Sequence, residues 1–261
     1  ADWLPDMRAG IEAAVREAFG DDLSGGIFVR SDTNVEDLPQ FSGAGLNLTL
    51  PNRRSMGDVL DGIKQVWTSP FTERAYLWRR QILEEQGDVY PSVLLLESVP
   101  SEKSGVMITS GLESGAPDDL TIATGEGVGA AVDGESAETI LVHPDGSVTL
   151  LGQSKAVARR VLVQGGGARM VPALRPDELL APAEIRQLRD VAERWKRVTI
   201  DRTAGRVWDF EFGFVEGRLW LFQVRPFVRF RSSELLERVS LLDRTALENA
   251  TEGIAMNELI P

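Results

Sequence analysis

The chain contains no cysteine and only one histidine among its 261 residues. Without cysteine, the chain cannot form disulfides, thiolate zinc sites, iron–sulfur clusters or a cysteine nucleophile. This lack is typical of a cytoplasmic protein, which is the location that we expect, although many secreted proteins also lack cysteine. The single histidine, His143, lies in "LVHPDGSVT", and its Pro-Asp-Gly is typical of a hairpin turn. We interpret His143 as a surface turn residue, which argues against a catalytic triad or a histidine-rich metal site.

Long apolar runs are also missing from the chain. No run of 18 apolar residues and no basic-then-apolar leader is found, so we expect no membrane partner. The 40 acidic residues outnumber the 28 Lys and Arg residues, and the formal net charge of -12 argues against a nucleic-acid surface. The first residue is alanine rather than methionine, which leads us to expect an excised or processed piece.

The residues that are present predict an α+β protein. Helical spacing of apolar residues predicts helices over 3–20, 55–69, 70–87 and 181–198. A short buried strand is expected in "GGIFVR", and the polar, glycine-containing segment after it is expected to be a long loop. From residue 91 onward, short alternating segments predict an antiparallel sheet, and "GGGARMVPALRP" is expected to be a flexible connector.

The segment "VWDFEFGFVEGRLWLFQVRP", residues 207–226, predicts a hairpin with two different faces. Alternation gives one face an aromatic wall, to which the second strand contributes Trp220, Phe222 and Val224. The other face carries polar side chains: Asp209, Glu211, Gln223 and Arg225.

Two interpretations of this polar face remain open. Two carboxylates and an amide oxygen are the hard ligands that magnesium prefers, and an arginine beside them can neutralise a phosphate. Alternatively, the face is an ordinary solvated surface on which Arg225 pairs with Asp209 or Glu211. Taken alone, the hairpin favours the second interpretation.

The segment "VRSDTNVEDLPQFSGAG" begins where the first predicted strand ends, so Arg30 and Ser31 lie at a strand terminus. Arg30 can make a bidentate contact with phosphate oxygens. Ser42, Gly43 and Gly45 can bring backbone N–H groups close to an anion. A glycine-containing loop is more often a plain turn than a phosphate-binding loop. The same holds for the second glycine-rich segment, "TGEGVGAAVDG".

Four segments in order together resemble the nucleotide-binding domain of the phosphoenolpyruvate synthase and pyruvate phosphate dikinase family. They are "VRSDTNVEDLPQFSGAGLNLTL", "IKQVWTSPFTERAYLWRR", "SVPSEKSGVMITS" and "DFEFGFVEGRLWLFQVRP". The resemblance covers residues 25–228 and implies an ATP-grasp-like fold, with an antiparallel β-rich lobe and helices. It implies ATP and Mg²⁺ as cofactors, with a nucleotide as partner.

The resemblance also implies a role for each matched residue. Arg30 and Arg225 would be catalytic residues that contact phosphate charge, and Glu211 and Gln223 would bind magnesium. The nucleotide would also be held by further residues: Ser31, Glu97, Val99 and Asp209.

From the same segments we expect a nucleotide-binding domain over residues 1–230. It would consist of the Arg30 loop with its helices (25–88), a β-rich lobe (89–170), and a helix with the metal-binding hairpin (171–230). Residues 231–261 are expected to form a helical tail or linker.

The chain departs from the family pattern in three ways. No lysine precedes Arg30, so we expect a fold incomplete at the N-terminus, without the family's lysine-bearing lobe. Ala130 stands where the family has a glutamate, and Leu96 stands where it has a glutamine.

Two functions follow, and a plain structural module ranks last. The first is the ATP-binding part of a phosphotransferase that phosphorylates a histidine on a separate swivelling domain. We expect the isolated chain to be inactive in that case. The second is a degenerate, non-catalytic module for nucleotide sensing or protein interaction. The final acceptor stays open between pyruvate, water, a glycan and an antibiotic.

Overall fold

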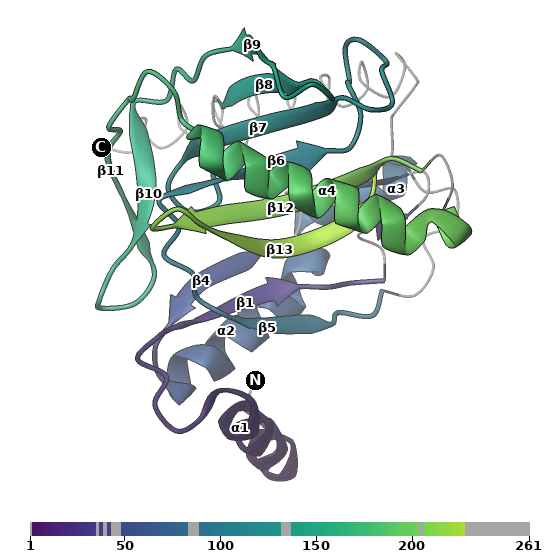
Figure 1. Cartoon of the computed structure of the whole chain (residues 1–261). Helices are drawn as coiled ribbons and strands as arrows, with labels where there is room; N and C mark the ends of the chain where they lie inside the picture. The colour runs from purple at the N-terminus through teal and green to yellow at the C-terminus, as the bar shows by residue number, and fades with distance from the viewer. Residues whose placement is uncertain are drawn as a thin grey trace, which may run out of the picture. The chain divides into compact units, whose positions relative to one another are not determined.

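The structure is a computed structural model of the chain (Figure 1), and it describes residues 2–34, 37–38, 41–42, 48–82, 89–131, 137–203 and 206–227. These residues fall within one compact unit, Ala1–Phe227. The tail expected over 231–261 lies outside the described residues, as do Gly43 and Gly45. The described residues form an α+β fold, as the sequence predicts.

The first sheet has three antiparallel strands in the order β4-β1-β5. The strands are β1 (Ile27–Ser31), β4 (Thr49–Arg53) and β5 (Val93–Glu97). Helix α2 (Met56–Thr68) is capped at its N-terminus by Ser55, whose hydroxyl accepts a hydrogen bond from the amide of Asp58. The buried side of α2 packs on β1, and α1 (Pro5–Phe19) adds Val15 to the same core. Shorter elements complete this region: β2 (Asp37–Leu38), β3 (Phe41–Ser42), η1 (Ser69–Phe71) and α3 (Glu73–Ile82).

The second sheet has six antiparallel strands in the order β13-β12-β6-β7-β8-β9. Its strands are β6 (Lys103–Ile108), β7 (Leu120–Glu126), β8 (Glu138–Val142), β9 (Val148–Gly152), β12 (Trp208–Val215) and β13 (Arg218–Pro226). Segments 207–226 and 103–108, far apart in the sequence, are therefore neighbours in this sheet.

Helix α4 (Pro182–Thr203) lies across β6, β12 and β13 (Figure 1). Its Leu188 and Ala192 pack with Phe210, Phe212 and Phe214 of β12 in one core cluster. The three phenylalanines are at most 1% exposed. Burying a side chain of this size stabilises a fold by about 1.5–3 kcal/mol, so this aromatic face fixes the position of β12.

The β12–β13 hairpin confirms the expected polar face but contains a bulge. Cross-strand pairing joins Asp209 to Arg225 and Glu211 to Gln223, and then shifts between Glu211 and Phe212. A Cβ on Gly213 would lie 2.8 Å from the Phe222 ring, so Phe222 lies on the polar face. The prediction that Trp220 and Phe222 belong to the aromatic wall is therefore wrong: Trp220 pairs with Gly213, and Leu219 packs on the core instead, because a bulge reverses the alternation of the strand that contains it.

Two further predictions about the sheets are wrong. The pattern from residue 91 predicts one sheet, but β5 pairs with β1 in the first sheet. The segment expected as a flexible connector contains β11 (Ala168–Pro172), which pairs with β10 (Ala158–Leu162) in a separate two-stranded ribbon. Alternation indicates a strand but not its partner, which depends on contacts between distant residues.

Within the described ranges, no helix is both long enough and apolar enough to cross a bilayer.

Candidate functional site

The candidate site begins at β1, which places Arg30 opposite the α2 side of its sheet. Val29 is fully buried, and a Cβ on Gly62 of α2 would lie 3.2 Å from it. Because neighbouring strand residues point to opposite faces, Arg30 points away from α2.

The hairpin supplies the other side of the site. Asp209 and Glu211 are 8% and 7% exposed and lie on the face of β12 opposite the phenylalanine core. Their cross-strand partners Arg225 and Gln223 share this face. This arrangement follows from the alternation of apolar and polar residues along β12, which keeps the two carboxylates out of the apolar core.

Arg30 reaches the hairpin although it lies 181 positions from Glu211 in the sequence. Its Nη1 donates to Glu211 Oε2 at 2.8 Å and its Nη2 donates to Glu211 Oε1 at 3.2 Å, so the contact is bidentate. The same Nη2 also donates to Gln223 Oε1. Beside this cluster, Arg225 Nε donates to Asp209 Oδ2 at 3.0 Å. The arginine, the carboxylate and the amide predicted from two distant segments therefore meet in one place.

The Arg30–Glu211 pair is more than a surface ion pair. The two side chains are 21% and 10% exposed, so water is largely excluded from the carboxylate. Exposed pairs contribute about 0–1 kcal/mol, whereas removing one partner of a buried pair costs about 3–5 kcal/mol. This pair lies between those limits and links the first sheet to the second.

The donor set fits a divalent cation. Glu211 and Gln223 direct two hard oxygens at one positively charged nitrogen of Arg30, which shows that positive charge is stabilised at that point. Carboxylate and amide oxygens of this kind are magnesium ligands. Among the residues that the structure describes, no group of three or more His, Cys, Asp or Glu side chains could hold a metal ion, at this cluster or elsewhere, so the protein ligands offered here are Glu211 and the Gln223 amide.

The remaining predicted site residues lie outside this cluster. Ser31 is buried on the α2 side of β1, facing away from Arg30. Glu97 pairs with Ile27, which places it on that same α2 side, and its side chain is exposed. Val99 is buried in the segment that leads from β5 to β6. Their contact with a nucleotide stays a prediction.

A buried serine that the sequence did not single out holds the glycine-rich segment 125–131. Ser104 Oγ donates to the carbonyl of Gly127 at 2.6 Å and accepts from the amide of Ala130 at 2.9 Å. Ala130 is 3% exposed and packs against Gly125. The sequence signal was a hydroxyl inside a buried strand, which needs a partner once it leaves water.

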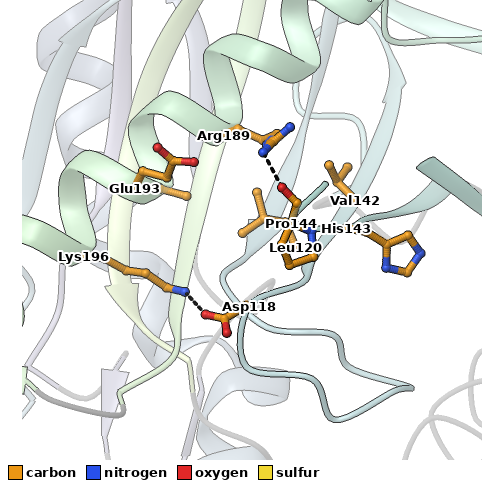
Figure 2. A pocket seen from close by; sticks show the side chains of 9 residues that line it. Asp118, Leu120, Val142, His143, Pro144, Arg189, Glu193 and Lys196 are labelled. Atoms are coloured by element: carbon orange, nitrogen blue, oxygen red, sulfur yellow. Dashed lines mark hydrogen bonds and ion pairs between the residues drawn. The ribbon is translucent and has the colours of Figure 1, made fainter. Parts of the chain in front are cut away.

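A cavity of about 210 Å³ lies beside α4 (Figure 2). Arg189 and Lys196 of the helix point toward Pro144 and Asp118, and Arg189 Nη2 donates to the Pro144 carbonyl at 2.9 Å. His143 is part of the turn between β8 and β9, as the sequence predicts. Its ring nitrogens lie 3.2 Å from Asp119 Oδ1 and 3.1 Å from Thr149 Oγ1. The histidine therefore anchors its turn.

The fold and this cluster define an α+β protein in which a basic strand end meets an acidic hairpin. The chain belongs to the family described as the pyruvate phosphate dikinase AMP/ATP-binding domain, whose model matches residues 4–240. This domain fits an ATP-grasp-like nucleotide-binding fold, which confirms the expected fold class and the resemblance found in the sequence.

Named relatives agree with this membership. The chain is 30% identical over 263 residues to a phosphoenolpyruvate synthase of Deinococcus radiodurans, with 92% of the chain and 32% of the relative covered. It is 28% identical over 230 residues to the phosphoenolpyruvate synthase of Pyrococcus furiosus, with 81% and 27% covered. It is 31% identical over 245 residues to a rifampicin phosphotransferase of Streptomyces sviceus, with 84% and 27% covered. The chain thus spans less than a third of the length of these curated relatives.

Proposed function

We propose that this chain is the ATP- and magnesium-binding part of a dikinase-type phosphotransferase. One observation carries the proposal: Arg30 of the first sheet contacts Glu211 and Gln223 of the second. This contact brings a guanidinium group, which can bind phosphate, next to the hard oxygens that can bind a metal ion. Membership of an AMP/ATP-binding domain family and the names of the relatives support a nucleotide as the ligand.

Each residue of the cluster has a proposed role. Arg30 and Arg225 bind phosphate oxygens and offset their negative charge, since guanidinium groups match phosphate geometry. Glu211 and Gln223 hold the magnesium ion, and Asp209 orients Arg225 through their 3.0 Å hydrogen bond. Magnesium, when bound, neutralises phosphate charge and fixes the geometry of the phosphate chain.

The acceptor in this proposal is a histidine on a swivelling domain of the parent protein. A ring nitrogen of that histidine would form a bond to phosphorus while the bond from phosphorus to the leaving phosphate oxygen breaks. In such transfers positioning and charge neutralisation supply most of the catalysis. His143 is a poor acceptor because Asp119 and Thr149 engage both ring nitrogens.

Labelling of the parent protein tests this function. The full-length protein is incubated with magnesium and ATP labelled at the β- or the γ-phosphate in separate reactions. We expect a label that is lost in acid and kept in base, as phosphohistidine is, and we expect Arg225→Gln to reduce its rate at least about tenfold.

The second candidate is a non-catalytic module that binds nucleotide for sensing or for protein contacts. The observation that favours it is Ala130, which is buried against Gly125 where the family has a glutamate. Nucleotide binding by the parent protein without any acid-labile label from either phosphate would support this candidate and contradict the first.

A further inference from the structure

We propose that Arg30 closes the metal site until a polyphosphate arrives, so that the site takes a divalent cation only together with its nucleotide. This inference rests on the proposed function, since it assigns Glu211 and Gln223 to the metal. It adds that Arg30 competes with the metal for the oxygens of these two residues.

The competition follows from which atoms Arg30 binds. Both carboxylate oxygens of Glu211 accept hydrogen bonds from Arg30, and Gln223 Oε1 accepts from Nη2 as well. These oxygens are the ones that a metal needs from the two residues. A guanidinium cannot share a carboxylate edge that a metal also occupies in bidentate fashion, so the two cations exclude one another.

Burial makes this competition effective. The Glu211 side chain is 10% exposed, so a bare metal ion must lose most of its water to reach it. Magnesium dehydrates reluctantly, and here it gains only the two residues that Arg30 already satisfies. Displacing Arg30 would also leave a partly buried guanidinium without those partners, which is unfavourable.

A polyphosphate lowers both costs, the dehydration of the metal ion and the loss of partners by Arg30. Its oxygens offer Arg30 a new bidentate partner, and they bring the metal partly coordinated. Arg30 can then turn from Glu211 to the phosphate while the metal takes the vacated oxygens. The Arg225–Asp209 pair lies alongside and does not involve these oxygens, so it can remain in place.

The test is the affinity for a metal ion alone, measured with Mn²⁺ by electron paramagnetic resonance on the chain without nucleotide. The wild-type chain is expected to bind Mn²⁺ weakly, and Arg30→Gln is expected to bind it at least about tenfold more tightly, because a charge-assisted contact no longer competes. Adding inorganic tripolyphosphate should raise Mn²⁺ affinity strongly for the wild type and little for Arg30→Gln.

Three variants make the result specific. Arg8→Gln removes a positive charge that pairs with Glu12 on the exposed surface of α1, and it should leave Mn²⁺ affinity unchanged. The double variant Arg30→Gln with Glu211→Gln should lose the gain. If Arg30→Gln fails to fold, Arg30→Lys serves instead, because lysine keeps the charge without the bidentate geometry and should give a smaller gain.

Equal Mn²⁺ affinity of the wild type and Arg30→Gln would overturn the inference. So would tight binding of Mn²⁺ alone to the wild type. Failure of the proposed function is a separate result, namely no binding of magnesium with ATP by the folded wild-type chain.

Discussion

At the scale of single residues, the sequence predicts which side chains share a face of the hairpin better than it predicts which distant residues they contact. Asp209, Glu211, Gln223 and Arg225 could be placed on one face from alternation alone, and the register confirms this. The bidentate contact between Arg30 and Glu211 could not be predicted, because no local pattern links residues 181 positions apart. Phe222 was misplaced for a related reason, since a bulge depends on cross-strand pairing.

Glu138 gives a pH prediction at this scale. Burial raises the pKa of Glu138 above its ordinary value of 4.5, although the amide of Leu179 donates to its carboxylate at 3.1 Å. The folded protein thus holds this proton more tightly than the unfolded chain does. The protonated form of Glu138 therefore stabilises the folded state at low pH, and this stabilisation is lost as the pH rises from about 4.5 through the folded pKa.

Thermal unfolding of Glu138→Gln checks this expectation. The substitution removes the buried charge but keeps an acceptor for Leu179, so it should raise the melting temperature at pH 7 and not at pH 4. The exposed Glu193→Gln serves as the control and should leave the melting temperature unchanged at both values. An equal effect of Glu138→Gln at both pH values would contradict the assignment.

At the scale of elements, most strands of the second sheet lie where alternation predicts them, but β4 begins inside the segment that is expected to be a long loop, and β2 and β3 also lie in that segment. Helices α1, α2 and α4 lie where the helical spacing of apolar residues predicts them. Of the two strands of the β10–β11 ribbon, β11 was not predicted, because the glycine-rich residues around it are typical of a flexible connector. The ribbon joins the second sheet through Gly127, which pairs with Arg160 of β10.

Gly127→Ala should break this junction. Gly127 has a φ of 87°, and a Cβ there would lie 2.3 Å from the Arg160 carbonyl oxygen. We expect a loss of about 1–2 kcal/mol from the backbone conformation and about 1–3 kcal/mol more from the clash. Urea denaturation measures the total.

Gly217→Ala is the matched control for this prediction. Gly217 also has a positive φ, 74°, but nothing lies within 4 Å of its Cβ position. Only the backbone term, about 1–2 kcal/mol, should be lost there. If the two variants lose the same stability, the close approach of Gly127 to Arg160 is not what holds the ribbon.

A second element-scale prediction concerns the glycine-rich segment that Ser104 holds. Ser104→Ala removes hydrogen bonds to Gly127 and Ala130 and should destabilise the fold by about 1–3 kcal/mol. Amide hydrogen exchange should increase at 127–131 and stay unchanged in α2, on the other sheet. Uniform faster exchange would instead indicate a global effect.

At the scale of the molecule, the two larger sheets of the compact unit Ala1–Phe227 have separate cores and meet at Arg30 and Glu211. Ordered motifs predicted the family and the fold class, and they contain the residues on both sides of the candidate site, because each motif is a local pattern. The contact between the two sides, Arg30 with Glu211, could not be predicted from these motifs, because it depends on how the whole unit packs. The expected division at residue 230 stays a prediction.

A double-mutant cycle measures how strongly Arg30 links the sheets. Arg30→Met should destabilise the unit by about 1–3 kcal/mol, since it leaves the carboxylate of Glu211 partly buried without this partner. In the Glu211→Gln background the same change should be milder, with a coupling energy of about 0.5–3 kcal/mol. Additive effects of the two substitutions would show that the contact contributes nothing.

The most direct test of the central claim is calorimetric titration of the chain with ATP in the presence of magnesium. We expect the wild type to bind, Glu211→Gln to bind at least about tenfold more weakly because one metal ligand loses its charge, and Arg8→Gln to match the wild type. Equal affinity of the wild type and Glu211→Gln, or no binding by the folded wild-type chain, would contradict the claim that this hairpin holds the metal and its nucleotide.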